Sequence, residues 1–342
     1  MRRRALIAAT SMAALGQVLQ GMGELAELDL PVGESLPSRL SMSHVYAVEA
    51  VTERLRSLTR QFGGQPELFG AAVKHYAQWL DVPASEAVKA RLGCALAELY
   101  TEVGWSCYDS GVDGTGHFTR ALGVADEFGD AFGIANAACH AGVTLVRSGH
   151  PDDALKCFQL GEFPLKGWRF QPGKSKPAIL RGDDPRVPIL TAWLKRDSAT
   201  AYALMGDRNE TQRYLAEAYE GWAPRDAFER AGADLTTAWI QIDLRQFDTA
   251  EQFAASAVRT YGESHRRSRT MAELTLAELH VRTGDSRGLA LARQAIDAAS
   301  TLYSVAARRQ RLVPLAAALE ARSGSDTKEL ARTARQLAAT RV

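Results

Sequence analysis

Few residues in this sequence could carry out chemistry, and their spacing does not assemble a catalytic motif. His140 stands beside Cys139, but neighbours one apart on a helix point in different directions, so the two cannot act on one substrate atom. No Ser/His/Asp arrangement and no pair of carboxylates can be argued from the order of the residues. We therefore expect a protein that is not an enzyme.

The sequence also offers no motif for a metal or a cofactor. The four cysteines, Cys94, Cys107, Cys139 and Cys157, include no C-x-x-C pair, and we expect them to be small, buried and reduced. Residues 167–175 place five residues between two glycines where a phosphate-binding loop has four, and no predicted strand precedes them. We expect no bound cofactor.

The candidate binding residues are aromatic and basic. Tryptophans at helical spacing mostly belong to a core, but those that line a groove are common anchors for a bound peptide. Two arginine clusters, residues 265–269 and 308–311, could lie on one edge of a repeat array, or could be solvated helix ends paired with nearby glutamates. The candidate contacts to a ligand or partner are Trp105, Asp109, His140, Trp193, Trp239, Arg266, Arg269 and Arg309.

Composition excludes several broad classes of protein. The 342 residues carry 41 Lys+Arg and 40 Asp+Glu, so the formal net charge of +1 creates no global field that would recruit nucleic acid. No apolar run reaches the roughly 20 residues that a membrane-spanning helix needs. We expect no membrane partner.

Helical spacing of apolar residues extends over most of the chain from residue 41. One predicted helix ends at Gly63-Gly64, and a second begins near Ser85 and ends near Asp109. Their apolar faces are formed by Val48, Val51, Leu55, Leu58 and Phe62, and by Leu92, Leu96, Leu99, Val103 and Cys107. No segment alternates with period two for long enough to predict a strand.

Short turns recur at a near-constant interval. The turn residues Gly111, Gly149, Gly206, Arg245 and Gly284 are separated by 38, 57, 39 and 39 positions. The long interval coincides with a stretch rich in proline, glycine and lysine at about residues 161–188, which we interpret as an insertion loop. The period predicts an all-α fold, a right-handed α-solenoid of divergent tetratricopeptide-like helix hairpins over residues 41–342.

Small residues follow most of these turns. Five positions after each turn residue stand Gly116, Ala154, Thr211, Ala250 and Leu289, four of which are small. We expect these positions to let the second helix of each hairpin approach the first closely.

Residues 1–40 form an N-terminal helix and linker in this interpretation. Arg2-Arg3-Arg4 followed by an apolar stretch has the pattern of a twin-arginine signal, which would indicate an exported scaffold protein. No clear cleavage site follows, and the cysteines suggest no disulfide framework. A short helix ahead of the solenoid in a cytoplasmic protein is the interpretation we favour.

Several dispersed motifs resemble one family of regulators. The sequence contains Leu55-Arg56-Ser57-Leu58 ahead of Gly63-Gly64, then 97–99 ahead of 104–111, and Arg266-x-x-Arg269 ahead of 276–279. In this order they resemble the C-terminal repeat region of actinobacterial transcriptional regulators that join a Cro/repressor-type helix-turn-helix to tetratricopeptide-like repeats. Arg3-Arg4-Ala5-Leu6-Ile7 is similar to the Arg-Arg-x-x-Leu run that follows the DNA-binding domain in that family.

This resemblance implies a function in regulation. We expect a non-enzymatic regulatory or adaptor protein that acts in the control of transcription and whose solenoid groove binds a peptide, a small signal molecule or a protein partner. Since these residues contain no helix-turn-helix, we do not expect direct DNA binding. Self-association as a homodimer stays open.

Overall fold

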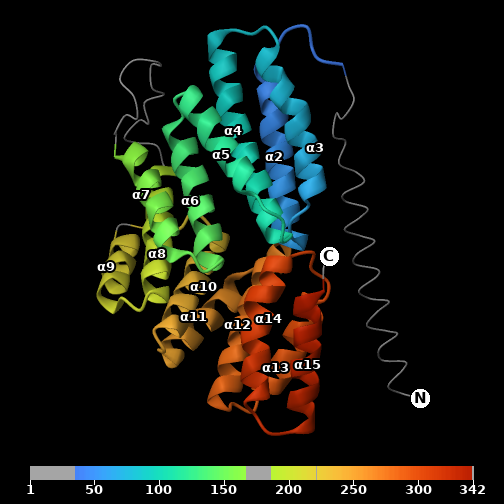
Figure 1. The fold of residues 1–342 in the computed structure, drawn as a ribbon, viewed down its shortest axis with the longest axis vertical. Coiled ribbons are helices and arrows are strands. Elements are labelled where there is room, and N and C mark those ends of the chain that lie inside the picture. The colour runs from blue at the N-terminus through green and yellow to red at the C-terminus, as the bar shows by residue number, and fades with distance from the viewer. Residues whose placement is uncertain (1–34, 167–185, 221, 341–342) are drawn as a thin grey trace, which may run out of the picture.

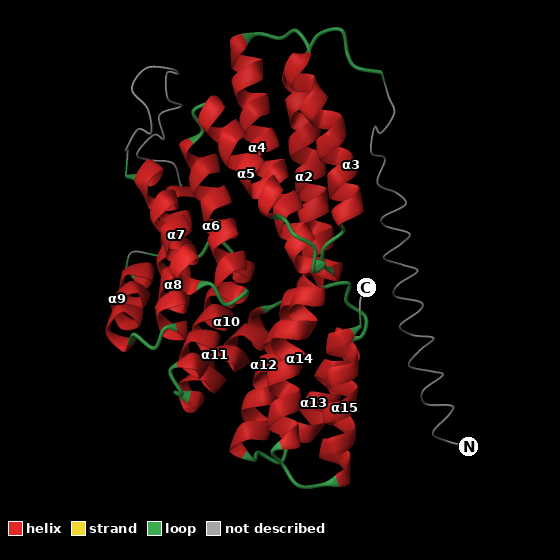
Figure 2. Cartoon of the chain, in the orientation of Figure 1, coloured by secondary structure: helices red, strands yellow, loops and turns green. Residues whose placement is uncertain are grey.

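A computed structural model describes residues 35–166, 186–220 and 222–340, and its regular structure there is helical (Figures 1 and 2). These residues form fourteen α-helices and two short 3-10 helices, with no strand among them. None of the described helices is long and apolar enough to cross a membrane. The all-α prediction is confirmed.

The α-helices follow one another as seven hairpins. In chain order they pair as α2 (Met42–Phe62) with α3 (Pro66–Ala77), α4 (Glu86–Asp109) with α5 (Thr115–Glu127), α6 (Ala131–Arg147) with α7 (Pro151–Leu165), α8 (Arg186–Leu204) with α9 (Arg208–Tyr219), α10 (Ala227–Asp243) with α11 (Phe247–Thr260), α12 (Arg266–Thr283) with α13 (Gly288–Ala299), and α14 (Val305–Glu320) with α15 (Ser325–Ala339). The first helix of each hairpin packs against the first helix of the next, which is the stacking of an α-solenoid.

The five turn residues found in the sequence share one backbone conformation. Gly111, Gly149, Gly206, Arg245 and Gly284 have φ values of 77°, 85°, 78°, 61° and 81°. Each lies just beyond the first helix of its hairpin, where a left-handed residue ends a helix and turns the chain. Glycine adopts this conformation without the strain that a Cβ introduces, so Arg245 is the exception among the five.

Close packing at the start of the second helix is confirmed for only three hairpins. Ala154, Thr211 and Ala250 are fully buried, whereas Gly116 has no atom within 4 Å of its Cβ direction and Leu289 is 37% exposed. In those two hairpins the close contact lies nearer the turn. A Cβ on Gly114 would lie 2.3 Å from the carbonyl oxygen of Gly104, and one on Gly288 would lie 3.0 Å from the backbone of His280.

Two sequence interpretations fall largely outside the described residues. These are the N-terminal segment with its signal-like pattern and most of the insertion at residues 161–188. Where that insertion is described it is helical, since α7 continues to Leu165 and α8 begins at Arg186.

The array curves until its C-terminal hairpins meet its N-terminal ones. Figure 1 shows the path running from α2 through α6 and α8 to α12–α15, which end beside the α2–α5 hairpins, and α12 contacts α2 while α14 contacts α4. The contact joins residues far apart in sequence, since Tyr303 donates its backbone N–H to the carbonyl oxygen of Phe62 at 2.8 Å. We call this contact the closure interface.

A buried aspartate is the centre of the closure interface. Asp109, the last residue of α4, is fully buried and accepts hydrogen bonds from the Arg267 guanidinium, from Ser304 Oγ at 2.7 Å and from the Gly64 backbone N–H at 2.9 Å. A carboxylate is disfavoured at the C-terminus of its own helix, so its partners must come from other elements. Arg267 belongs to α12, and Ser304 caps α14 by accepting from the Ala307 N–H at 3.0 Å. We call Asp109, Arg267 and Ser304 the clasp.

Gly63 and Gly64 serve the closure interface as well as ending α2. A Cβ on Gly63 would lie 2.7 Å from the backbone nitrogen of Ser304, and one on Gly64 would lie 2.3 Å from the carbonyl oxygen of Ser106. A larger residue at Gly63 would therefore push the two ends of the array apart, and one at Gly64 would push α2 away from the end of α4.

Replacing the clasp aspartate should destabilise the whole protein. In Asp109→Ala the buried Arg267 loses its ion pair, and we expect the free energy of unfolding to fall by about 3–5 kcal/mol in urea denaturation. The matched control is Asp126→Ala on the exposed side of α5, which should change it by less than about 0.5 kcal/mol. Equal stability of the two variants would contradict the clasp.

Candidate functional site

The inner helices of the array enclose a cavity of about 360 Å³. Residues from α2, α4, α6, α8, α10 and α12 line it, so six successive hairpins each contribute one wall. Two smaller pockets, of about 160 and 170 Å³, adjoin this space, and each shares Arg147 and Thr236 with it. We call the three together the central cavity. Its size is within the range of small-molecule sites.

Arg147 and two tryptophans form the inner wall. The guanidinium carbon of Arg147, the last residue of α6, lies 5.3 Å from the ring centre of Trp105 and 5.2 Å from that of Trp239. Arg311, from α14, lies over the same Trp239 ring at 4.4 Å. The indole Nε1–H of Trp239 donates to Thr275 Oγ1 at 3.0 Å, which fixes the ring. Two cations therefore meet on the faces of one indole.

Both of these guanidinium groups are desolvated. Burial lowers the pKa of Arg147, and burial lowers that of Arg311 to about 10, because both guanidinium groups are largely removed from water; both line one of the smaller pockets. Within the described part of the chain neither forms an ion pair with a carboxylate, and the buried Nε of Arg311 has no hydrogen-bond partner. Arginine donors in this state are free to bind an anion.

The acidic groups of the cavity do not neutralise these arginines by contact. Asp197 and Asp243 line the smaller pockets, and burial raises the pKa of both, that of Asp243 to about 6. Asp197 accepts a weak bond from the Cys139 thiol at 3.9 Å. The inner end of the cavity keeps an excess of positive charge, since Arg196 also lies there with a buried, unpartnered Nε.

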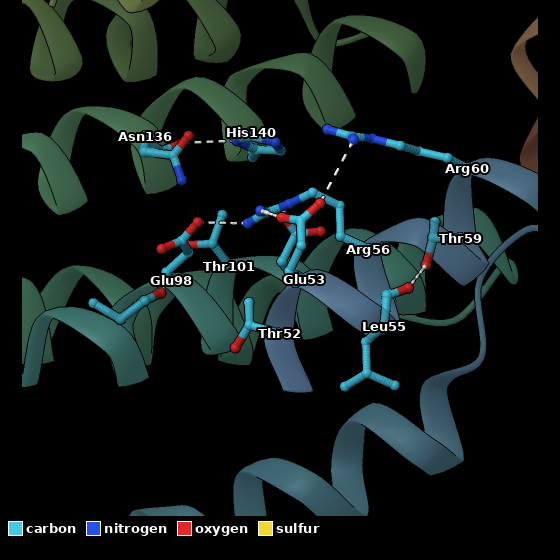
Figure 3. Close-up of polar contacts among 12 residues, drawn as sticks. Thr52, Glu53, Leu55, Arg56, Thr59, Arg60, Glu98, Thr101, Asn136 and His140 are labelled. Carbon is cyan, nitrogen blue, oxygen red and sulfur yellow. Dashed lines mark hydrogen bonds and ion pairs between the residues drawn. The ribbon is translucent and has the colours of Figure 1, made fainter. Parts of the chain in front are cut away.

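The opposite wall is a saturated ion network that joins α2 to α4. Arg56 donates from Nε to Glu102 at 2.8 Å, from Nη2 to Glu98 at 2.5 Å and from Nη1 to Glu53. Figure 3 shows Arg56, Glu53 and Glu98 between the two helices. Burial alone would lower the pKa of Arg56, but the carboxylates more than offset it and raise that pKa. Burial would raise the pKa of Glu102, yet Arg56 holds it below the usual range. This wall therefore positions helices and leaves no donor for a ligand.

Arg60 and His140 complete this side of the cavity. Figure 3 places Arg60 above the network, with 3.9 Å to Glu53, and its guanidinium carbon lies 4.5 Å from the ring centre of Phe228. The Nδ1 of His140 lies 2.9 Å from the carbonyl oxygen of Asn136, one turn earlier on α6.

The structure divides the residues predicted from sequence into two groups. Trp105, His140, Trp193 and Trp239 all line the central cavity. The others lie elsewhere. Asp109 belongs to the clasp, Arg266 donates to Thr301, Arg269 pairs with Glu263 and Glu273, and Arg309 is exposed on α14. The solvated, glutamate-paired alternative thus describes Arg269, whereas Arg309 stands on a separate cleft next to the closure interface.

Sequence reasoning missed the arginines of the inner wall. Arg147 has the position of an ordinary basic residue at a helix C-terminus, and Arg311 is one of several arginines in the 308–311 cluster. Their common feature is contact with Trp239, which joins α6, α10 and α14 and becomes visible only when the array closes.

Comparison with protein-family models gives no match, and comparison with curated proteins gives none either. Among the described residues no group of three or more His, Cys, Asp or Glu side chains could hold a metal ion. The case for a function therefore depends on the geometry of the cavity.

Removing Arg56 should destabilise the fold through Glu102. In Arg56→Met the buried Glu102 carboxylate loses its partner, and we expect a loss of roughly 3 kcal/mol of unfolding free energy at pH 7. The double variant Arg56→Met/Glu102→Gln should recover at least half of it, because no buried charge remains.

The unfolding free energy lost in Arg56→Met should become smaller as the pH falls. In the wild type the lowered pKa of Glu102 contributes stability above its ordinary pKa of 4.5, and that contribution disappears as the pH falls. The deficit of Arg56→Met should therefore shrink below about pH 4.5 in denaturation experiments. A deficit that stays constant from pH 7 down to pH 3 would contradict this role.

Proposed function

We propose that this protein is a non-enzymatic regulatory or adaptor module that binds a ligand in the central cavity and passes on its occupancy through the closure interface. The ligand enters a space built by six hairpins, so a change in their relative tilt changes the cavity. A solenoid in which each hairpin contacts its neighbours suits such a change, because small rotations add along the array.

One observation supports the proposal most directly: Trp105, which lines the cavity, contacts both Arg147 of the cavity and Arg267 of the clasp. Trp105 lines the cavity, and its ring centre is 5.3 Å from the guanidinium carbon of Arg147 and 6.0 Å from that of the clasp residue Arg267. A ligand that moves Arg147 or Trp105 therefore acts on the residue that pairs with Asp109. Occupancy and closure become linked equilibria, which is the physical content of ligand sensing.

The resemblance noted in the sequence supports a place for this module in transcriptional regulation in the cytoplasm. On that basis the hairpins are divergent tetratricopeptide repeats, and the ligand is a small signal molecule or the end of a peptide. An enzyme is not proposed. The described cavity walls place the Cys139 thiol beside the Asp197 carboxylate, but burial raises the pKa of this thiol well above its usual value and so disfavours the nucleophilic thiolate.

A cavity-filling variant tests the proposal without damaging the fold. Gly232 lines the cavity on α10, and a Cβ there would meet only Tyr261 Oη at 3.6 Å. Gly232→Leu should keep or raise stability, since glycine in a helix interior is unfavourable by about 1 kcal/mol relative to good helix formers, while its side chain occupies the cavity. Gly232→Ala is the matched control that leaves the cavity open.

The measurement is the melting temperature of each variant with fractionated small molecules and peptides from cell extract. We expect at least one fraction to raise the melting temperature of the wild type and of Gly232→Ala by about 2 °C or more, but not that of Gly232→Leu. If no fraction raises it, or if Gly232→Leu responds equally, the cavity is not the binding site.

A further inference from the structure

The inner wall of the central cavity defines the chemistry of the ligand more narrowly. We propose that the cavity binds a small organic anion, a carboxylate or a phosphate ester with a flat apolar body, whose charged group is held by Arg147 and Arg311. This inference rests on the proposed function and names the ligand class of the same site.

The first argument is the state of the two arginines. Their guanidinium groups lie at 5.2 and 4.4 Å from the centre of the same Trp239 ring, so two like charges are held close together in a desolvated place. Burial disfavours both charges, and Arg147 further lowers the pKa of Arg311; Glu278 and Asp243 act in the opposite direction but do not restore that pKa to its usual value. Indole faces offset part of this, but they leave the N–H edges of the guanidinium groups without an anionic partner.

The second argument is an unused donor. Arg311 Nε is buried and has no acceptor within the described residues, and the same is true of Arg196 Nε in the adjoining pocket. A buried donor without an acceptor costs roughly 1–3 kcal/mol, so such groups generally indicate a ligand or a functional constraint. An oxyanion between Arg147 and Arg311 would accept from both side chains at once.

The third argument concerns the body of the ligand. Trp105, Trp193 and Trp239 line the main space with Arg147, together with Leu190 and Met271. Arg311 lines the adjoining smaller pocket, which also includes Arg147 and Trp239. Flat aromatic walls stabilise flat apolar groups by stacking and by area removed from water. An inorganic anion would form hydrogen bonds with the arginines but would leave the aromatic walls exposed to water.

Size favours a small molecule over a polymer. The main space is about 360 Å³, and the array returns on itself at the closure interface, so the cavity does not continue as an open groove along the solenoid. Arg147 lies against two indole rings at the inner end of this space, a setting that suits a small charged group.

The test is a titration with defined probes that share a benzene ring and differ in the polar group and its charge. Phenyl phosphate and benzoate are the anions, and benzamide is the neutral control with the same ring. Binding is followed by calorimetry and by quenching of tryptophan fluorescence, since Trp105 and Trp239 flank the site. We expect saturable binding of at least one anion, at least tenfold tighter than benzamide.

Variants assign the binding to the inner wall. Arg147→Gln and Arg311→Gln should each weaken anion binding at least tenfold, whereas Arg293→Gln, on the exposed side of α13, removes the same charge and should stay within twofold of the wild type. Since the two buried charges are unfavourable in the empty cavity, melting temperatures of the two variants should equal or exceed that of the wild type. If these arginines had only a structural role, both substitutions would lower the melting temperature.

Two results would overturn the inference. One is anion binding no tighter than benzamide binding, and the other is anion affinity within twofold of wild type in both arginine variants. If extract fractions still protect Gly232→Ala but not Gly232→Leu while the anions fail, only the ligand class is wrong. If neither probes nor fractions bind, the proposed function fails as well.

Discussion

The architecture depends on one buried ion pair between residues 158 positions apart. Asp109 ends α4 and has no favourable partner within its own hairpin. Arg267 lies in the first turn of α12 and is buried against Asp109. Stacking of neighbouring hairpins would by itself give an open solenoid, because each hairpin needs only its neighbours to cover its apolar face. The clasp, together with the glycines at 63 and 64, joins the first hairpins to the last and turns the inner groove into a cavity.

Closure has an electrostatic consequence. It gathers arginines from α6, α8 and α14 at the inner wall, where burial disfavours the charges of Arg147 and Arg311 and no carboxylate of the described residues is in ion-pair contact with them. A protein selected only for stability would pair or replace such groups, since buried unpaired charge is unfavourable. The contrast with the Arg56 network is informative, because there the largely buried Arg56 and Glu102 are paired with each other, and Arg56 also pairs with the more exposed Glu53 and Glu98. Unpaired donors on one wall and saturated donors on the other indicate where a ligand binds.

The sequence predicted local features well, and distant contacts poorly. The turns at Gly111, Gly149, Gly206, Arg245 and Gly284 were recognisable because a left-handed residue and a change of apolar face leave a local pattern. Trp105 and Trp239 could be proposed as anchors for the same reason, as large aromatics at helical spacing. The role of Asp109 could not be predicted, since nothing near it in sequence identifies Arg267 as its partner. Arg147 and Arg311 were missed because their significance depends on a cavity that exists only after closure.

The central claim is that closure is a stable property of the folded chain and depends on the clasp. It is tested most directly by measuring the distance between spin labels at Glu67→Cys on α3 and Lys328→Cys on α15, in a background without the four native cysteines, by double electron–electron resonance. The account predicts one narrow distance distribution in the otherwise native chain, and a broader, longer one when Asp109→Ala is added under conditions where the protein stays folded. A distribution that is already broad with the clasp intact, or one that Asp109→Ala leaves unchanged, would contradict it.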